Sequence, residues 1–251
     1  MSRPVSANAP SAGGRAAAPA ALPVIAVTGM AFEARIVRGE GVDAVFAARA
    51  DLLERALTAA VARGCAGIIS FGTAGGLAPD LEPGALIVAE GVDGPLGPVS
   101  TDSAWSGRIA AALLATPLAA KLRRGRLAGV AAPLTGSADK AARHRATGAL
   151  AVDMESHLAG AIAHAHRLPF VVCRAVVDPA WRTLPPAATA GLRDDGSTAI
   201  APILRELIRQ PSQLRPLIQL AADARAARAT LVDARRVLEQ AGALRFSPRL
   251  G

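Results

Sequence analysis

Acidic and small residues follow three apolar, strand-like stretches of this sequence. Residues 28–33 read TGMAFE, residues 71–77 read FGTAGGL, and the acidic segments 152–156 (VDMES) and 174–178 (RAVVD) flank a helix-like stretch. In open α/β sheets, ligands bind at the carboxyl ends of the strands. The order of these segments therefore predicts that they meet in one pocket at that edge of a sheet.

The first two segments suit different chemistry. Gly29 permits a tight turn, and Glu33 could act as an acid or a base, with a helix-capping glutamate as an equal alternative. The second segment leaves backbone N–H groups uncovered, which suits an anion or a sugar edge, or a structural turn, at Gly72, Thr73, Ala74 and Gly75. Because the GxGxxG spacing and the GKS or GKT ending are absent, dinucleotide and P-loop sites are excluded.

The third site pairs Glu155 with Asp178. Carboxylates beside apolar strands are costly to bury unless they are hydrogen-bonded, so both need partners, and a ligand could supply them. A purely structural alternative is that Asp178 pairs with Arg174 or caps a turn. From these residues alone, the two interpretations are equally well supported.

The elements that position these residues alternate along the chain. Apolar runs predict strands at 23–28, 66–71, 85–90, 127–134 and 169–177, and periodic runs predict helices at 48–63, 105–115, 138–147 and 156–167. This alternation is typical of crossover helices that link the strands of a mainly parallel sheet.

The C-terminal part, residues 198–244, is predicted to be helical, with interruptions near Pro211 and Pro216. Its last helix is expected to pack on the sheet through one face, with a membrane-surface helix as the alternative. That face carries Ala221, Ala224, Arg228, Leu231, Ala234 and Leu238.

Composition limits the remaining possibilities. The chain has 251 residues, of which 51% are hydrophobic, enough for one sizeable core. We expect a disordered tail at residues 1–21, a catalytic domain at 22–210 and a C-terminal helical extension at 211–251. The net charge of +8 comes with no nucleic-acid-binding motif, so we expect no nucleic-acid partner.

The cysteines and histidines predict no metal site. Cys65 and Cys173 lie far apart in apolar runs, which favours buried, reduced thiols in a cytoplasmic protein. The histidines lack metal-ligand spacing, so solvent-facing or hydrogen-bonded side chains are expected at His144, His157, His164 and His166.

In combination and order, the segments GMAFE, FGTAGGL, VDMES and CRAVVD resemble the purine nucleoside phosphorylase and methylthioadenosine/adenosylhomocysteine nucleosidase superfamily, over about residues 24–178. The resemblance implies a single-domain, three-layer α/β/α fold with a mixed, mainly parallel central sheet. It also implies an enzyme that breaks the bond between a purine and a ribose, with no metal or redox cofactor.

The resemblance assigns a role to each motif residue. Asp178 would donate a proton or hydrogen bond at purine N7, and Glu155 would accept hydrogen bonds from the ribose hydroxyls. Met154 would pack beneath the sugar, and Glu33 would position a nucleophilic water. A homo-oligomer is expected by analogy.

Two departures from the superfamily pattern bear on the reaction. Residues 135–140 (TGSADK) lack the aromatic side chain that commonly stacks on the base in hydrolytic members. Ser70 stands where phosphorolytic members commonly have an arginine for phosphate, and Arg35 or Arg38 could compensate. Hydrolysis and phosphorolysis therefore both stay open, with inorganic phosphate as an optional co-substrate.

Within the superfamily, TGMAFEARI and VDMES with the Ala/Arg-rich C-terminus look most similar to the hopanoid-associated phosphorylases. This implies adenosylhopane as substrate and contact with the inner membrane surface. Its lipid tail would need an apolar exit, for which the candidates are Phe32, Trp105, Trp181 and Leu184.

Other functions fit the same motifs. One alternative is a general purine nucleoside phosphorylase or a methylthioadenosine/adenosylhomocysteine nucleosidase, which differs only in its substrate. The other is a non-catalytic nucleoside-binding or membrane-adaptor protein, which would bind a nucleoside without releasing the base.

Overall fold

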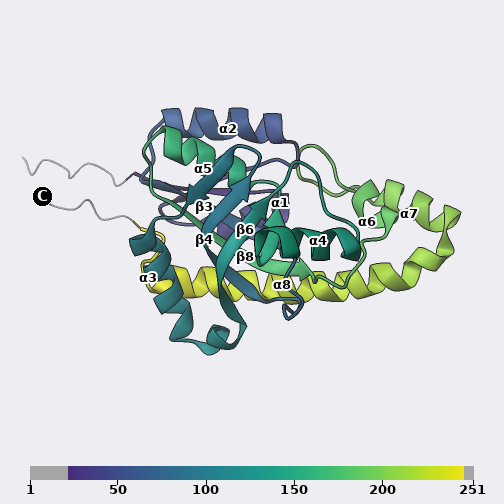
Figure 1. The fold of residues 1–251 in the computed structure, drawn as a ribbon. Coiled ribbons are helices and arrows are strands. Elements are labelled where there is room, and N and C mark those ends of the chain that lie inside the picture. The colour runs from purple at the N-terminus through teal and green to yellow at the C-terminus, as the bar shows by residue number, and fades with distance from the viewer. Residues whose placement is uncertain (1–21, 246–251) are drawn as a thin grey trace, which may run out of the picture.

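A computed structural model describes residues 22–245 (Figure 1). The tail expected at residues 1–21 lies outside this range. Helices pack on both faces of a mixed central sheet, which confirms the predicted three-layer α/β architecture. The strands are β1 Val24–Thr28, β2 Val42–Phe46, β3 Gly67–Gly76, β4 Leu86–Gly94, β5 Gly97–Ser100, β6 Leu122–Gly129, β7 Ala151–Asp153 and β8 Phe170–Asp178.

The sheet has the strand order β2-β1-β3-β7-β6-β4-β5, and β8 pairs with both β3 and β4. The strands β3, β8, β4, β6 and β7 thus form a closed ring. Most pairings are parallel, whereas β7 runs antiparallel to β3, and β5 and β8 run antiparallel to β4. The prediction of a mixed, mainly parallel sheet is confirmed.

Two apolar cores lie on opposite faces of the sheet. One contains side chains from α2 and α5, and the other contains side chains from α1, α3 and α8. The helices are α1 Ala31–Val37, α2 Ala50–Ala62, α3 Ser103–Leu114, α4 Ser137–Thr147, α5 Ser156–Ala165, α6 Pro186–Ala190, α7 Ile200–Arg209 and α8 Leu214–Gln240, with 3-10 turns η1 Pro117–Lys121 and η2 Pro211–Gln213.

Several predicted elements need correction. The segment 71–77 belongs mostly to β3, because its backbone pairs with β8 and β7. The strand predicted at 127–134 lies earlier, at Leu122–Gly129, where exposed arginines hid it. The short strands β2, β5 and β7 and the helices α1 and α6 were not predicted.

The C-terminal helix also differs in detail. Pro211 does separate α7 from α8, but Pro216 lies inside α8, in the first turn, where a backbone N–H has no helical partner to lose. Of the predicted inner face, Leu231, Ala234 and Leu238 are buried. The other three predicted positions are exposed, because the buried face of α8 contains Asp223 and Ala227 instead.

The thiols and one histidine complete the description of the core. Cys65 and Cys173 are free and buried, as predicted, and burial raises the pKa of the Cys173 thiol to about 12. His157 is buried, and its Nδ1 has no hydrogen-bond partner in the described part of the chain, so the prediction for this histidine was wrong. Between residues 22 and 245, no helix combines the length and the apolar character needed to cross a membrane.

Candidate active site

A cavity of about 360 Å³ lies at the carboxyl ends of the parallel strands β1, β3 and β8. Parallel strands end at one edge of a sheet, so the segments that follow β1 and β8 meet the last residues of β3. All three predicted segments contribute to its lining: Met30, Phe32, Thr73, Ala74, Gly75, Asp153, Met154, Glu155 and Asp178.

Glu33 lies next to this cavity and is not part of its lining. It is in the first turn of α1, and its Oε2 atom accepts hydrogen bonds from the backbone N–H groups of Gly29 (3.1 Å) and Met30 (3.0 Å). Its Oε1 atom accepts hydrogen bonds from the backbone N–H and the hydroxyl of Thr73, both at 2.7 Å. Because a carboxylate has about four acceptor positions, Glu33 is fully occupied and joins α1 to β3.

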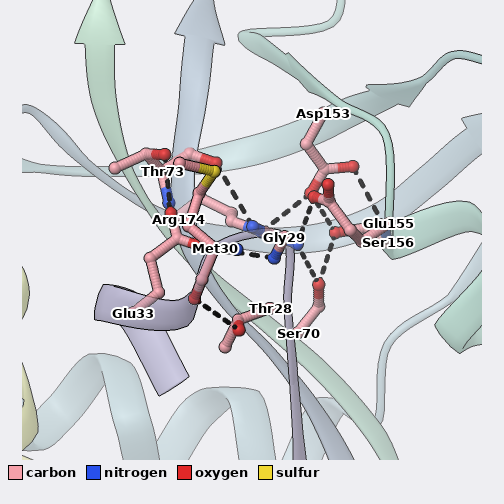
Figure 2. Close-up of polar contacts among 10 residues, drawn as sticks. All are labelled: Thr28, Gly29, Met30, Glu33, Ser70, Thr73, Asp153, Glu155, Ser156 and Arg174. Atoms are coloured by element: carbon pink, nitrogen blue, oxygen red, sulfur yellow. Dashed lines mark hydrogen bonds and ion pairs between the residues drawn. The ribbon is translucent and has the colours of Figure 1, made fainter. Parts of the chain in front are cut away.

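Arg174 forms the buried centre of the site (Figure 2). From β8 it pairs with Asp153 at 2.8 Å and with Glu155 at 3.1 Å, and it donates hydrogen bonds to the Ser70 hydroxyl at 2.6 Å and to the Thr73 carbonyl at 3.2 Å. The sequence did not identify Arg174 or Asp153 as site residues. Both lie inside recognised motifs, which was the only signal for them.

Glu155 lines the cavity together with Asp153 of the same segment. It precedes α5, and its side chain packs on Gly29, where an added Cβ would lie 2.5 Å from Oε1. Burial raises the pKa of Glu155 to about 8, while the positive charge of Arg174 opposes this rise. The Glu155 carboxyl group therefore favours the protonated acid at neutral pH even with Arg174 beside it, and it lines the cavity.

Asp178 lines the cavity from the end of β8, and its partner is Lys140 and not Arg174. Lys140 in α4 is completely buried, and its Nζ lies 2.5 Å from Asp178 Oδ2. The same ammonium donates to the carbonyls of Arg182 (2.9 Å) and Pro179 (3.2 Å). Burial raises the pKa of Asp178, and Lys140 lowers it. Lys140, from the segment that lacks the expected aromatic residue, was missed.

The rest of the lining is mainly apolar. Phe32 and Leu184 take part in it, as expected for an apolar exit, together with Pro133, Leu134, Val177, Ala188, Leu192 and Leu220. Trp105 does not, because its ring is fully buried in the core beneath α8 and its Nε1 donates to the Ala243 carbonyl at 2.7 Å. Trp181 is exposed and lies outside the lining.

Comparisons with known proteins agree with this geometry. A family model described as "Phosphorylase superfamily" matches residues 23–209. No curated protein sequence matches the chain.

Among solved structures, the chain is similar to a mutant 5'-methylthioadenosine/S-adenosyl homocysteine nucleosidase of Helicobacter pylori that holds 5'-methylthioadenosine. The TM-score is 0.60 and the identity 14%, over 88% of this chain and 98% of that one. The S-adenosylhomocysteine nucleosidase of Streptococcus pyogenes gives 0.57 and 17%, over 64% and 86%. The futalosine hydrolase of Helicobacter pylori gives 0.53 and 16%, over 62% and 88%. At these identities, the likeness shows a shared fold.

Proposed function

The chain belongs to the phosphorylase superfamily, and from this membership and the cavity we propose that it is an enzyme that hydrolyses the N-glycosidic bond of a purine nucleoside. The observation that carries the proposal is the arrangement of Asp178, which is buried, and Glu155, which is partly buried: the two carboxyl groups come from separate segments and line one cavity. One can serve the base and the other the sugar.

Asp178 is the proposed general acid. As the bond between the ribose C1′ and the purine N9 breaks, its electron pair moves to the base, and Asp178 gives a proton to N7 so that the base leaves neutral. Burial of Asp178 favours the protonated acid before the step, and Lys140 favours the carboxylate that the step leaves behind. Since Lys140 occupies Oδ2, we assign the proton to Oδ1.

Glu155 and Met154 are proposed to hold the ribose. The Glu155 carboxylate accepts hydrogen bonds from the sugar hydroxyls, and Met154 packs beneath the ring. Both line the cavity. Arg174, 3.1 Å from Glu155, holds the carboxyl group in place, and its positive charge opposes the rise of the Glu155 pKa that burial causes.

Water is the proposed nucleophile, and Glu33 acts on it through Thr73. Thr73 lines the cavity, and its hydroxyl already donates its hydrogen to Glu33 at 2.7 Å, so the hydroxyl oxygen can accept a hydrogen bond from a water. As the water oxygen bonds to C1′, one water proton passes to the Thr73 oxygen, and the Thr73 proton passes to Glu33. This relay replaces the direct contact expected from the sequence.

The charges around the sugar side support hydrolysis over phosphorolysis. No lysine or arginine is among the described residues that line the cavity. Arg174 is already shared by Asp153 and Glu155, and Glu33 lies beside it. A phosphate dianion in the cavity would lie beside Asp153 and Glu155, with no lysine or arginine of the described lining to bind it, which is unfavourable in a site of low dielectric. Ser70, at the position of the expected phosphate-binding arginine, is buried and bonded to Arg174.

For the substrate, we propose an adenine nucleoside with a large apolar group, with adenosylhopane as the first candidate. The apolar walls formed by Leu134, Leu184 and Leu192 support this choice, together with the sequence resemblance. In this proposal the protein works in the cytoplasm at the inner membrane surface, as a homo-oligomer. The proposed chemistry uses side chains and water alone.

The test is release of the purine base, measured by chromatography, from adenosylhopane, methylthioadenosine and inosine, each with and without phosphate. We expect base release without phosphate, and the highest kcat/KM for adenosylhopane. Saturable binding without product would show a nucleoside-binding protein and overturn the proposal, and so would release that requires phosphate. A higher kcat/KM for methylthioadenosine would reassign the substrate to the general nucleosidase alternative.

A further inference from the structure

Exposed large hydrophobic side chains gather at one corner of the protein. We call this the apolar corner and define it by residues of α7, of the start of α8 and of the segment that follows α6: Leu192, Ile200, Leu204, Ile208, Leu214 and Ile218. In Figure 1, α6 and α7 lie apart from the sheet, near the N-terminal end of the long helix α8. Exposed apolar side chains gathered in this way mark interaction sites on soluble proteins.

Helix α7 presents the clearest part of this surface. Ile200, Leu204 and Ile208 follow one another at intervals of four residues, so they share a face of the helix. They are 68%, 52% and 82% exposed, and α7 has no buried residue. The helix therefore exposes these apolar side chains to water, and none of its residues belongs to the two cores.

On α7 and in the first turn of α8, arginines outnumber acidic residues, which favours an anionic partner. Arg205 and Arg209 lie on α7, and Arg215 lies at the start of α8. Arg209 pairs with Glu206, whereas Arg205 and Arg215 form no ion pair with any residue between 22 and 245. Apolar side chains flanked by arginines are the pattern of helices that lie in the plane of a membrane interface. The net charge of +8 acts in the same direction.

The apolar corner is continuous with the cavity. Leu192 is 41% exposed and also lines the cavity, as do Ala188 of α6 and Leu220 of α8. An apolar substituent on a bound nucleoside would thus pass along side chains that end at this corner. A lipid surface in that position would supply such a substrate without passage through water.

We propose that the apolar corner docks the protein on an anionic phospholipid surface, with Ile200, Leu204 and Ile208 inserted among the lipids and the arginines at the headgroups. The role in substrate delivery rests on the proposed function, but docking itself does not.

The experiment is flotation of the full chain with vesicles of phosphatidylcholine alone and with 30% phosphatidylglycerol, a fraction of roughly the order that gives a strongly anionic surface. We expect binding to the anionic vesicles that weakens as salt increases, and at least tenfold weaker binding by Leu204→Asp/Ile208→Asp. The matched control is Leu96→Asp/Leu114→Asp, which changes two similarly exposed leucines away from the corner and should bind as the wild type does.

Two further measurements keep the outcomes distinct. Thermal unfolding and base release from a water-soluble nucleoside should be the same for Leu204→Asp/Ile208→Asp and the wild type, which shows that the site is intact. Absence of binding to both vesicles overturns the docking proposal even if the protein hydrolyses nucleosides. The docking proposal is also overturned if the wild type binds no vesicles and sedimentation shows an oligomer that Leu204→Asp/Ile208→Asp breaks. The corner is then a contact between copies of the chain.

Discussion

At the scale of single residues, charge pairs that are far apart in the sequence control the proposed chemistry. Asp178 pairs with Lys140, and Glu155 pairs with Arg174. The side chains of Lys140 and Arg174 are almost completely buried. A buried charge that loses its partner is strongly destabilising. Substitutions in the site therefore change stability as well as catalysis, and tests must separate the two.

Asp178→Asn is expected to lower kcat by about 10²- to 10⁴-fold, because the general acid is lost. It should also lower the free energy of unfolding, by up to about 3–5 kcal/mol, because Lys140 loses its counter-ion. The double variant Asp178→Asn/Lys140→Met removes both charges, and it should regain stability without regaining turnover. Near-normal kcat in Asp178→Asn would refute the assigned role.

Thr73 offers an isosteric comparison for the water relay. Thr73→Val loses the hydroxyl that bonds to Glu33, and a hydrogen bond to a charged group contributes about 1.5–3 kcal/mol, or roughly 10- to 150-fold in rate. Thr73→Ser keeps the hydroxyl and should stay within a few-fold of the wild-type kcat. Equal base-release rates for the valine and serine variants would remove Thr73 from the mechanism.

The raised pKa of Glu155 predicts a pH-dependent stability. Because its pKa rises from 4.5 to about 8 on burial, the folded state favours the protonated acid. This contribution to stability is complete below pH 4.5 and is lost as the pH rises toward 8. Denaturant unfolding of wild type and Glu155→Gln should show the wild type losing stability relative to the variant over this range. A difference that does not change with pH would contradict the assignment.

At the scale of elements, the sequence predicted the long apolar strands and missed those whose formation depends on neighbours. β1 and β8 were recognisable from continuous apolar runs. β7 has only three residues and exists because it bridges β6 and β3. The glycine-rich end of β3 looked like a loop, since propensity alone disfavours glycine in strands.

The same limit applies to the site. Motif order was enough to predict that Thr73, Glu155 and Asp178 share a cavity. It could not show that Lys140 reaches Asp178, because only the folded chain brings this side chain of α4 to the end of β8. Nor could it show that Trp105 is in the core, since a tryptophan in an amphipathic helix suits a core or a pocket equally.

Gly72 tests how closely β3 must approach its neighbours. Its φ is +154°, and an added Cβ would lie 2.7 Å from both Arg174 Nη1 and Glu33 Oε2. Gly72→Ala should therefore destabilise the fold by roughly 1–3 kcal/mol and reduce turnover, because it separates Glu33 from Thr73. The control is Gly107→Ala in α3, where nothing lies within 4 Å and a gain of about 0.5–1 kcal/mol is expected. Unchanged thermal unfolding and turnover for Gly72→Ala would contradict the packing described.

At the scale of the whole molecule, the ring of β3, β8, β4, β6 and β7 brings distant segments to one edge, with α4 and α6 beside it. The lining of the resulting cavity includes Leu192, which also belongs to the apolar corner. Chemistry and the proposed lipid contact thus occupy one end of the molecule. We propose that this cavity uses water to separate a purine from its ribose.

The most direct measurement is the reaction of an adenine nucleoside in ¹⁸O-labelled water with phosphate present, with both products analysed by mass spectrometry. We predict free adenine and a sugar product that carries ¹⁸O at C1′. A sugar 1-phosphate without the label, or no adenine at all, would contradict the account.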